Sequence, residues 1–127
     1  MINNTAKLIS IIFISLFITN VCAAPMLCPN MSNSTPPLDW YVLNIATGKP
    51  LSPQPATIQL DTFIGAAYSE HYAFKGECFY RSANKVILLG SNTISKPVAD
   101  LTNAWKWSNN LALCKTTDLT ACIFGSS

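Results

Sequence analysis

The sequence predicts a small all-β domain, an antiparallel sandwich or barrel-like fold stapled by two disulfides. Short apolar runs alternate with segments rich in proline, asparagine and serine, at a spacing typical of antiparallel strands. Four of the five cysteines remain if a secretory signal is removed, and an even number in a short exported chain predicts disulfides. Two strand-like runs, residues 74–81 and 85–91, are close enough in sequence to form a hairpin.

The chain opens with the layout of a secretory signal peptide. Lys7 supplies a positive charge, and Leu8 to Ile18 (LISIIFISLFI) contains no charged residue. This run is shorter than the roughly 20 residues that a membrane-spanning helix needs. Cleavage at the small residues that follow would remove residues 1–23, including Cys22, and leave a single β domain over residues 24–127. We therefore expect a secreted or periplasmic protein; an acylated Cys22 and an uncleaved anchor are the alternatives.

The four remaining cysteines allow three pairings. We predict Cys114 with Cys122, because CKTTDLTAC closes a short loop, and this leaves Cys28 with Cys78. On the chain-entropy model, loops of about nine and about fifty residues stabilise the fold by on the order of 2.6 and 4 kcal/mol. Zinc is the competing interpretation. The chain has no C-x-x-C pair and one histidine, so we expect no metal and no other cofactor.

The other predicted elements follow in chain order. Proline-rich stretches are expected to be loops, because proline cannot donate a backbone hydrogen bond within a helix or a central strand. The predicted order is an arm or loop at residues 29–37, a strand at 39–43, a loop at 46–55, and strands at 57–68, 74–81 and 85–91.

The clearest local structure is a hairpin made of GECFYR, SANK and VILLG. A turn at residues 82–85 would place Cys78 opposite Leu89 on adjacent antiparallel strands. Because side chains alternate along a strand, Cys78 and Phe79 would face opposite sides of the sheet. Residues 86–89 are apolar on both faces, which predicts a central strand covered on each side or a short buried helix. The face of Phe79 also carries Glu77 and Arg81, and that of Cys78 carries Tyr80.

Residues 95–107 fit two structures. Ser95 could cap one short helix near residues 97–105, with Pro97 in its first turn. The alternation in Trp105 to Trp107 (WKW) also suits a strand, and the pattern leaves both structures open.

The charge balance excludes some classes of partner. Without Lys7, seven Lys and Arg residues face six Asp and Glu residues, a net charge of +1, and the basic residues are scattered. Nucleic acid and anionic membranes are recognised by clustered basic residues. We therefore expect no nucleic-acid partner and no membrane span once the signal is removed.

The spacing of cysteines and aromatic residues resembles that of a group of short secreted bacterial proteins catalogued as a domain of unknown function. The shared features are a Cys-Pro pair, a following tryptophan, a central Gly-x-Cys-x-Tyr and a terminal Cys…Cys-x-Phe. The resemblance spans most of the mature chain and implies an exported bacterial protein, but it brings no catalytic residues. The matching positions are Cys28, Pro29, Trp40, residues 76–80, Cys114 and residues 122–124.

An enzyme is not predicted. Acid–base chemistry by histidine would have to use His71, the only histidine, in SEHYAF. The six acidic residues lie in no recognisable motif, and the chain has no phosphate loop, G-x-S-x-G or H-E-x-x-H. A hydrolase centred on His71 is the third alternative. The acidic residues are Asp39, Asp61, Glu70, Glu77, Asp100 and Asp118.

Aromatic residues are the remaining candidates for binding, because they give a large contact area at a small entropic cost. We expect a protein-interaction module first: an envelope accessory, an enzyme inhibitor or a secreted host-directed factor. The alternative is a glycan or small-ligand binder that uses a Trp/Tyr patch. The possible platforms pair Trp40 with Tyr41, Tyr68 with Tyr72, and Trp105 with Trp107, and the candidate binding residues are Phe79, Trp105, Trp107 and Tyr72.

Overall fold

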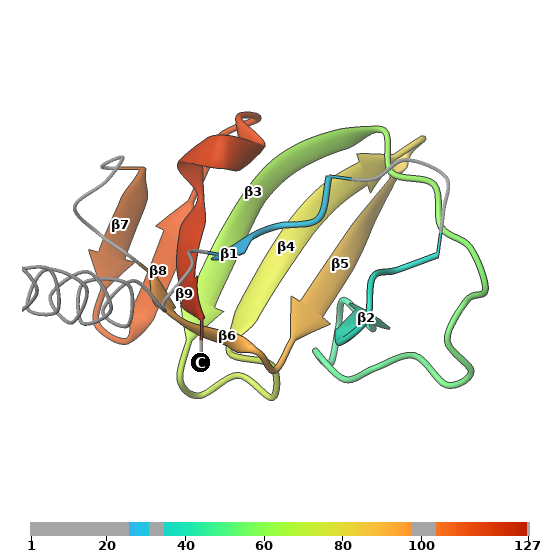
Figure 1. The fold of residues 1–127 in the computed structure, drawn as a ribbon, viewed down its shortest axis with the longest axis horizontal. Helices are drawn as coiled ribbons and strands as arrows, with labels where there is room; N and C mark the ends of the chain where they lie inside the picture. Colours follow the sequence, from blue (N-terminus) through green and yellow to red (C-terminus); the bar gives the residue numbers. More distant parts are fainter. Residues whose placement is uncertain (1–25, 31–34, 98–103, 127) are drawn as a thin grey trace, which may run out of the picture.

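The structure, a computed structural model, describes residues 26–30, 35–97 and 104–126. Within these ranges the chain forms two antiparallel sheets and one 3₁₀ turn, η1 (Leu119–Ala121), and no α-helix (Figure 1). The predicted all-β fold is confirmed. The larger sheet has the order β2 (Trp40–Leu43), β5 (Lys85–Ser91), β4 (Gly76–Ser82), β3 (Thr62–Ser69), β8 (Leu111–Cys114) and β7 (Trp105–Ser108), and the smaller has β1 (Met26–Leu27), β9 (Ile123–Ser126) and β6 (Ile94–Pro97).

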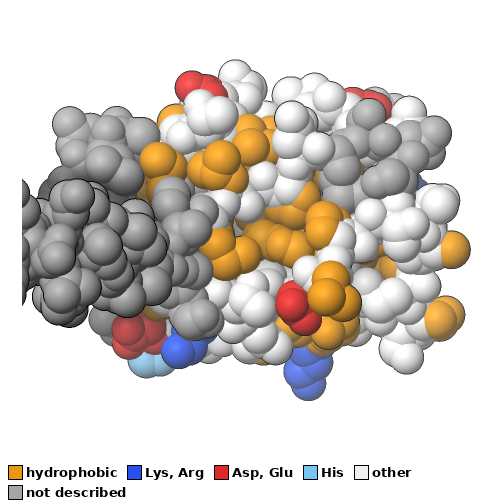
Figure 2. Space-filling view, in the orientation of Figure 1, with side chains coloured by type: hydrophobic (Ala, Val, Ile, Leu, Met, Phe, Trp, Pro, Cys, Tyr) orange, Lys and Arg blue, Asp and Glu red, His pale blue; other side chains and the backbone are white. Residues whose placement is uncertain are grey.

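The two sheets enclose the main core. Phe124 of β9 is fully buried, and its ring meets that of Trp105 at 5.0 Å between centroids. The indole N–H of Trp105 donates to the backbone carbonyl of Ile123 at 3.1 Å, which ties β7 to β9. The smaller sheet lies across β3 and β4, and apolar side chains reach the surface in the middle of the face that it leaves partly uncovered (Figures 1 and 2).

The predicted hairpin is confirmed residue by residue. Cys78 pairs with Leu89, and the register continues to Ser82 opposite Lys85. Ala83 adopts a left-handed conformation in the turn, with φ of 54°. The strand excludes the buried-helix alternative for residues 86–89. Coverage on both faces was predicted for this whole run, but it fails at one end, because Val86 beside the turn is 41% exposed.

The segment around residues 95–107 follows the strand interpretation where it is described. Ser95 and Pro97 lie in β6, so Ser95 does not cap a helix, and of the two alternatives the strand is the one observed here. The partner of β6 is β9, which lies much later in the sequence. The local pattern around Ser95 could not indicate this pairing. The WKW run forms β7. The predicted helix near residues 97–105 falls largely on residues 98–103, which lie outside the described residues.

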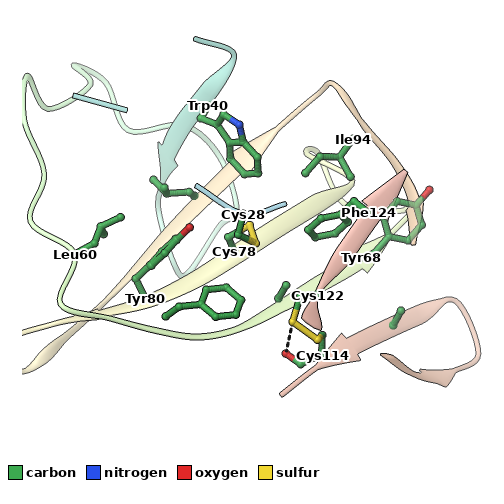
Figure 3. Close-up of a cluster of buried hydrophobic side chains, with 14 of the residues drawn as sticks. Cys28, Trp40, Leu60, Tyr68, Cys78, Tyr80, Ile94, Cys114, Cys122 and Phe124 are labelled. Carbon is green, nitrogen blue, oxygen red and sulfur yellow. Dashed lines mark hydrogen bonds between the residues drawn. A yellow bond between two sulfur atoms is a disulfide. The ribbon is translucent and has the colours of Figure 1, made fainter. Parts of the chain in front are cut away.

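Both predicted disulfides are present. Cys28 is joined to Cys78 across 50 residues of sequence, and Cys114 to Cys122 across 8. All four cysteines are buried in the main core (Figure 3). The Tyr80 hydroxyl donates to the carbonyl of Pro29 at 2.6 Å, so a hydrogen bond reinforces the link between the amino-terminal arm and β4.

The proline-rich loop at residues 46–55 completes the edge strand β2. The side-chain amide of Gln54 accepts from the backbone N–H of Val42 and donates to its carbonyl, both at 2.8 Å. It also donates to the carbonyl of Leu51 at 2.8 Å. The amide thus occupies the place of a further strand and hides the open edge.

We predict that Gln54→Leu lowers the free energy of unfolding by about 1 kcal/mol, because it leaves the backbone N–H of Val42 without its partner, whereas the Val42 carbonyl still accepts from the N–H of Leu51. Denaturant unfolding would measure the change. Gln59→Leu is the matched control, because the Gln59 amide only approaches exposed Asp61 at 3.4 Å. Equal losses in the two variants would contradict the role of Gln54.

Candidate functional site

The four predicted binding residues do not form one surface. Trp105 is 6% exposed and belongs to the core, which removes it from any binding surface. Trp107, two residues along β7, is 41% exposed. Phe79 packs on a separate small cluster on the opposite face of the large sheet, and Tyr72 lies in the connection between β3 and β4. Of these four residues, Trp107 is the one that keeps an exposed ring on the side of the large sheet that faces the main core.

Trp107 lines a cavity of about 270 Å³ where one end of β3 meets the turn between β7 and β8. The turn contains Asn109, whose φ of 56° is left-handed, a conformation that asparagine tolerates better than most residues. The cavity therefore depends on the geometry of a tight turn beside an edge strand. Its lining residues are Tyr68, Glu70, Lys96, Trp107, Asn109 and Asn110.

Tyr68 forms the aromatic wall next to Trp107. The two ring centroids lie 6.3 Å apart and the planes are inclined by 67°, so the rings make a corner and are not coplanar. The Tyr68 side chain is almost entirely buried. Burial, followed by the charge of Glu70, raises the pKa of the Tyr68 hydroxyl. The hydroxyl therefore stays protonated over the ordinary pH range and remains a hydrogen-bond donor.

Lys96 reaches the same cavity from the smaller sheet. Its ammonium nitrogen lies 5.4 Å from the centroid of the Trp107 ring, a cation–π contact. Since Lys96 belongs to β6 and Trp107 to β7, the site is built where the two sheets meet. The Lys96 ammonium and the Glu70 carboxylate give the lining one charge of each sign.

His71, in the connection after β3, borders this region. Its Nε2 lies 3.1 Å from the side-chain amide nitrogen of Asn110, and the residue is exposed. Ser69 accepts from the backbone N–H of His71 at 3.2 Å, so the serine contacts the main chain and not the ring. A nucleophile–histidine–carboxylate array requires hydrogen bonds through the ring nitrogens. The described contacts instead make His71 a support for the Asn110 amide.

A buried carboxyl lies on the other face of the large sheet. Glu77 is 7% exposed, and burial raises the pKa of its carboxyl to about 7. A Cβ built on Gly48, which has a φ of 71°, would lie 3.7 Å from Glu77 Oε2, so the loop after β2 passes directly over this carboxyl. The pKa of the Tyr72 hydroxyl is raised by burial and then by the charge of Glu77. Glu77 thus packs within this face of the sheet, beneath the loop.

A second, more apolar cavity of about 300 Å³ adjoins the edge strand β2. Leu38, at its rim, is 90% exposed, and Tyr41 is 38% exposed. The ring of Tyr41 packs against Phe74 at 5.5 Å. The rest of the apolar lining comes from Pro36, Pro37, Trp40 and Pro55.

Comparisons with family models, curated proteins and solved structures return no match for this chain. In the part of the chain that the structure describes, no three or more His, Cys, Asp or Glu side chains gather as a metal site would require. The same ranges hold no helix with the length and apolar character needed to cross a membrane.

Sequence reasoning identified Trp107 and the aromatic Tyr68 but missed the polar part of the cavity. Its residues come from β6, the turn after β3 and the turn after β7. One local signal existed: SNN at residues 108–110, directly after WKW, has the composition of a hairpin turn. Nothing in the sequence around Lys96 indicated that it would lie on the Trp107 ring.

Proposed function

We propose that this chain is an exported binding protein whose ligand occupies the cavity beside Trp107, which we name the Trp107 cavity. One observation carries the proposal: a tryptophan ring remains 41% exposed within a cavity whose other lining groups are mostly polar. Exposed aromatic rings with converging polar groups are typical of ligand sites. This favours the ligand-binding alternative over the protein-interaction module that the sequence suggested first.

Recognition without chemistry is the better interpretation of the groups around this cavity. The histidine that borders the cavity is His71, and its ring contacts the side-chain amide of Asn110. Asn110 is neutral and cannot exchange a proton with it as a carboxylate would. The arrangement thus supports orientation of a hydrogen-bonding side chain, and a hydrolase centred on His71 has no comparable support.

Export is proposed from the covalent framework. Two buried disulfides, which persist in oxidising compartments, hold the described strands together. The signal-like pattern at residues 1–23 agrees with this interpretation, as does the resemblance to short secreted bacterial proteins. A secreted or periplasmic location follows from the proposal.

We predict that small polar compounds shift the indole N–H signal of Trp107, and not those of Trp40 and Trp105, in ¹H–¹⁵N spectra. The reason is that Trp107 is the tryptophan at the cavity, whereas the other two rings are buried. A mixed panel of mono- and disaccharides, amino acids, amines and organic acids provides the probes.

The same compounds should also shift the side-chain amide signal of Asn110, which lines the same cavity. Trp107→Ala should abolish this Asn110 shift while changing the free energy of unfolding by no more than about 1 kcal/mol, because the ring is partly exposed. Leu38→Ala is the matched control, since it removes an exposed apolar side chain from the other cavity. Shifts confined to the surface around β2, or shifts that survive Trp107→Ala, would contradict the proposal.

A protein partner is the second candidate, and the exposure of Leu38 favours it. A leucine that is 90% exposed beside three prolines and Tyr41 is unusual for a small surface, and apolar patches of this kind often bind other proteins. Loss of a partner with Leu38→Ala, but not with Trp107→Ala, would place protein recognition at β2.

A further inference from the structure

The identity of the groups around the Trp107 cavity restricts the chemistry of its ligand. The Trp107 ring gives a flat apolar surface at the end of an edge strand, and Tyr68 stands at 67° to it as a second wall. A flat ring contacts best a ligand that is itself flat and carries C–H groups on one face. Such a ligand must still be polar at its rim, because most of the remaining lining is polar.

The polar lining offers both acceptors and donors around that ring. Glu70 contributes a carboxylate, which accepts, and Lys96 an ammonium, which donates. Asn109 and Asn110 each present an amide with both functions. The Asn110 amide is already held by His71 Nε2 at 3.1 Å, so part of its orientation is fixed before a ligand enters. Adjacent hydroxyl groups, which both donate and accept, are the complement of such a set.

The balance of charge favours a neutral ligand. Glu70 and Lys96 carry opposite charges in the same lining, so the cavity has no net charge to offer an anion or a cation. A charged ligand would contact one of the two favourably and the other unfavourably. Hydroxyl groups form charge-assisted hydrogen bonds with both.

The volume sets the size of the ligand. About 270 Å³ lies just below the range of roughly 300 to 1,000 Å³ that is usual for small-molecule sites. One ring with a neighbouring substituent or second ring fits a cavity of this size better than a long chain. The openness of the site to solvent at Trp107 would let further units of an oligomer extend outwards.

Lys96 has to share the indole with the ligand. Its ammonium lies over the ring at 5.4 Å from the centroid, and the residue is exposed, so its flexible stem can move at small cost. A ring entering the cavity would displace this contact and leave the ammonium at the rim, where it can donate to a ligand oxygen.

From these observations we infer that the Trp107 cavity binds a neutral saccharide of one or two rings, with its C–H face on Trp107 and its hydroxyls on Glu70, Lys96 and the two asparagines. This inference rests on the proposed function and names the class of ligand. A site for ammonium groups would also use the aromatic corner and Glu70, but Lys96 would repel such a ligand. The inference therefore distinguishes a saccharide site from an ammonium site.

The test compares neutral and charged probes in calorimetric titrations of the oxidised protein. The probes are maltose, cellobiose and N,N′-diacetylchitobiose as neutral saccharides, with choline as a cation and glucuronate as an anion. At least one disaccharide should bind, and its dissociation constant should change by less than about twofold between about 20 and about 500 mM NaCl, because no net charge is paired. Choline and glucuronate should bind at least about tenfold more weakly.

Two pairs of variants sharpen the test. Trp107→Ala should weaken the best disaccharide by about tenfold or more, whereas Trp107→Phe keeps a flat ring and should lose less. Glu70→Gln should weaken the disaccharide several-fold by removing a charge-assisted bond, while Glu77→Gln on the opposite face should leave its affinity unchanged. Circular dichroism would show that each variant is folded.

The outcomes separate this inference from the function on which it rests. Choline binding that is tighter than any disaccharide and is lost with salt would overturn the saccharide class and leave a ligand site at Trp107. If none of the three disaccharides binds, the inference is also wrong. The proposed function is then tested separately by the ¹H–¹⁵N spectra recorded with the mixed panel of compounds. Saccharide binding that survives Trp107→Ala would overturn both.

Discussion

Replacing Cys28 and Cys78 together by alanine is expected to lower the free energy of unfolding by on the order of 4 kcal/mol or more. The bridge closes a loop that spans 50 positions of sequence, so its loss restores a large amount of freedom to the unfolded chain. A typical stability is about 5 to 15 kcal/mol, so this single change removes a large share of it. Denaturant unfolding of the oxidised proteins would measure the loss.

The local structure adds to this expected loss. Both sulfurs lie in the main core, and alanine at the two positions removes buried atoms that contact neighbouring apolar side chains. Without the bridge, the arm that Cys28 anchors keeps its pairing with β9 and one described hydrogen bond to β4, from the Tyr80 hydroxyl to Pro29. That hydrogen bond is worth about 1 kcal/mol, so it replaces only a small part of what the disulfide contributes.

The second bridge provides the matched comparison. Cys114→Ala with Cys122→Ala opens a loop of 8 positions, for which the expected loss is on the order of 2.6 kcal/mol before any packing change. Cys122 and Cys114 are as deeply buried as the other pair, so the difference between the double variants reports loop length. A larger loss from the short loop would show that chain entropy is not the main contribution.

The hairpin and the disulfides were predictable because both depend on local or countable features. Alternation fixed the face of Cys78, and a short turn fixed the register with β5, since a shift by one residue would have exposed every core side chain. The cysteine pairing followed from the short spacing of one pair. These features need no knowledge of distant contacts.

The smaller sheet could not be predicted in the same way. β1 has two residues, and its partner β9 lies almost at the other end of the chain. The start of β3 was placed too early, because Ile58 and Leu60 are buried although they precede the strand. Burial outside a strand gives the same apolar signal as burial within one.

The site was predictable only in its aromatic part. WKW alternation showed that Trp105 and Trp107 share a face, but not that the end of β7 leaves the second ring at the surface. Lys96 reaches that ring because β6 belongs to the other sheet. The arrangement of three separate segments around a cavity is a property of the packed fold, and no local pattern contains it.

Glu77→Gln is expected to stabilise the protein at pH 8 by on the order of 3 kcal/mol at most, and to change little near pH 4. Burial raises the pKa of the Glu77 carboxyl from 4.5 to about 7, so the folded state holds this proton more tightly than the unfolded state. Wild-type stability from this group is therefore highest below about pH 4.5, falls as the pH rises to about 7, and then stays low. Glutamine keeps the shape without the charge and removes this dependence.

The difference between variant and wild type, measured by denaturant unfolding at several pH values, isolates Glu77 from the other carboxyls. The difference should grow between about pH 4.5 and pH 7 and then level off. Glu70→Gln is the matched control, because its side chain is exposed, and it should change the free energy of unfolding by less than about 0.5 kcal/mol. A constant difference across this range, or a stabilisation that appears only at acid pH, would show that the loop over Glu77 does not desolvate its carboxyl.

The loop is the part of the structure through which this charge acts, since Gly48 passes directly over Oε2. Faster hydrogen exchange of the Gly48 amide in the wild type at pH 8 than in Glu77→Gln, after correction for the intrinsic rate, is therefore the expected local sign of the ionised carboxyl.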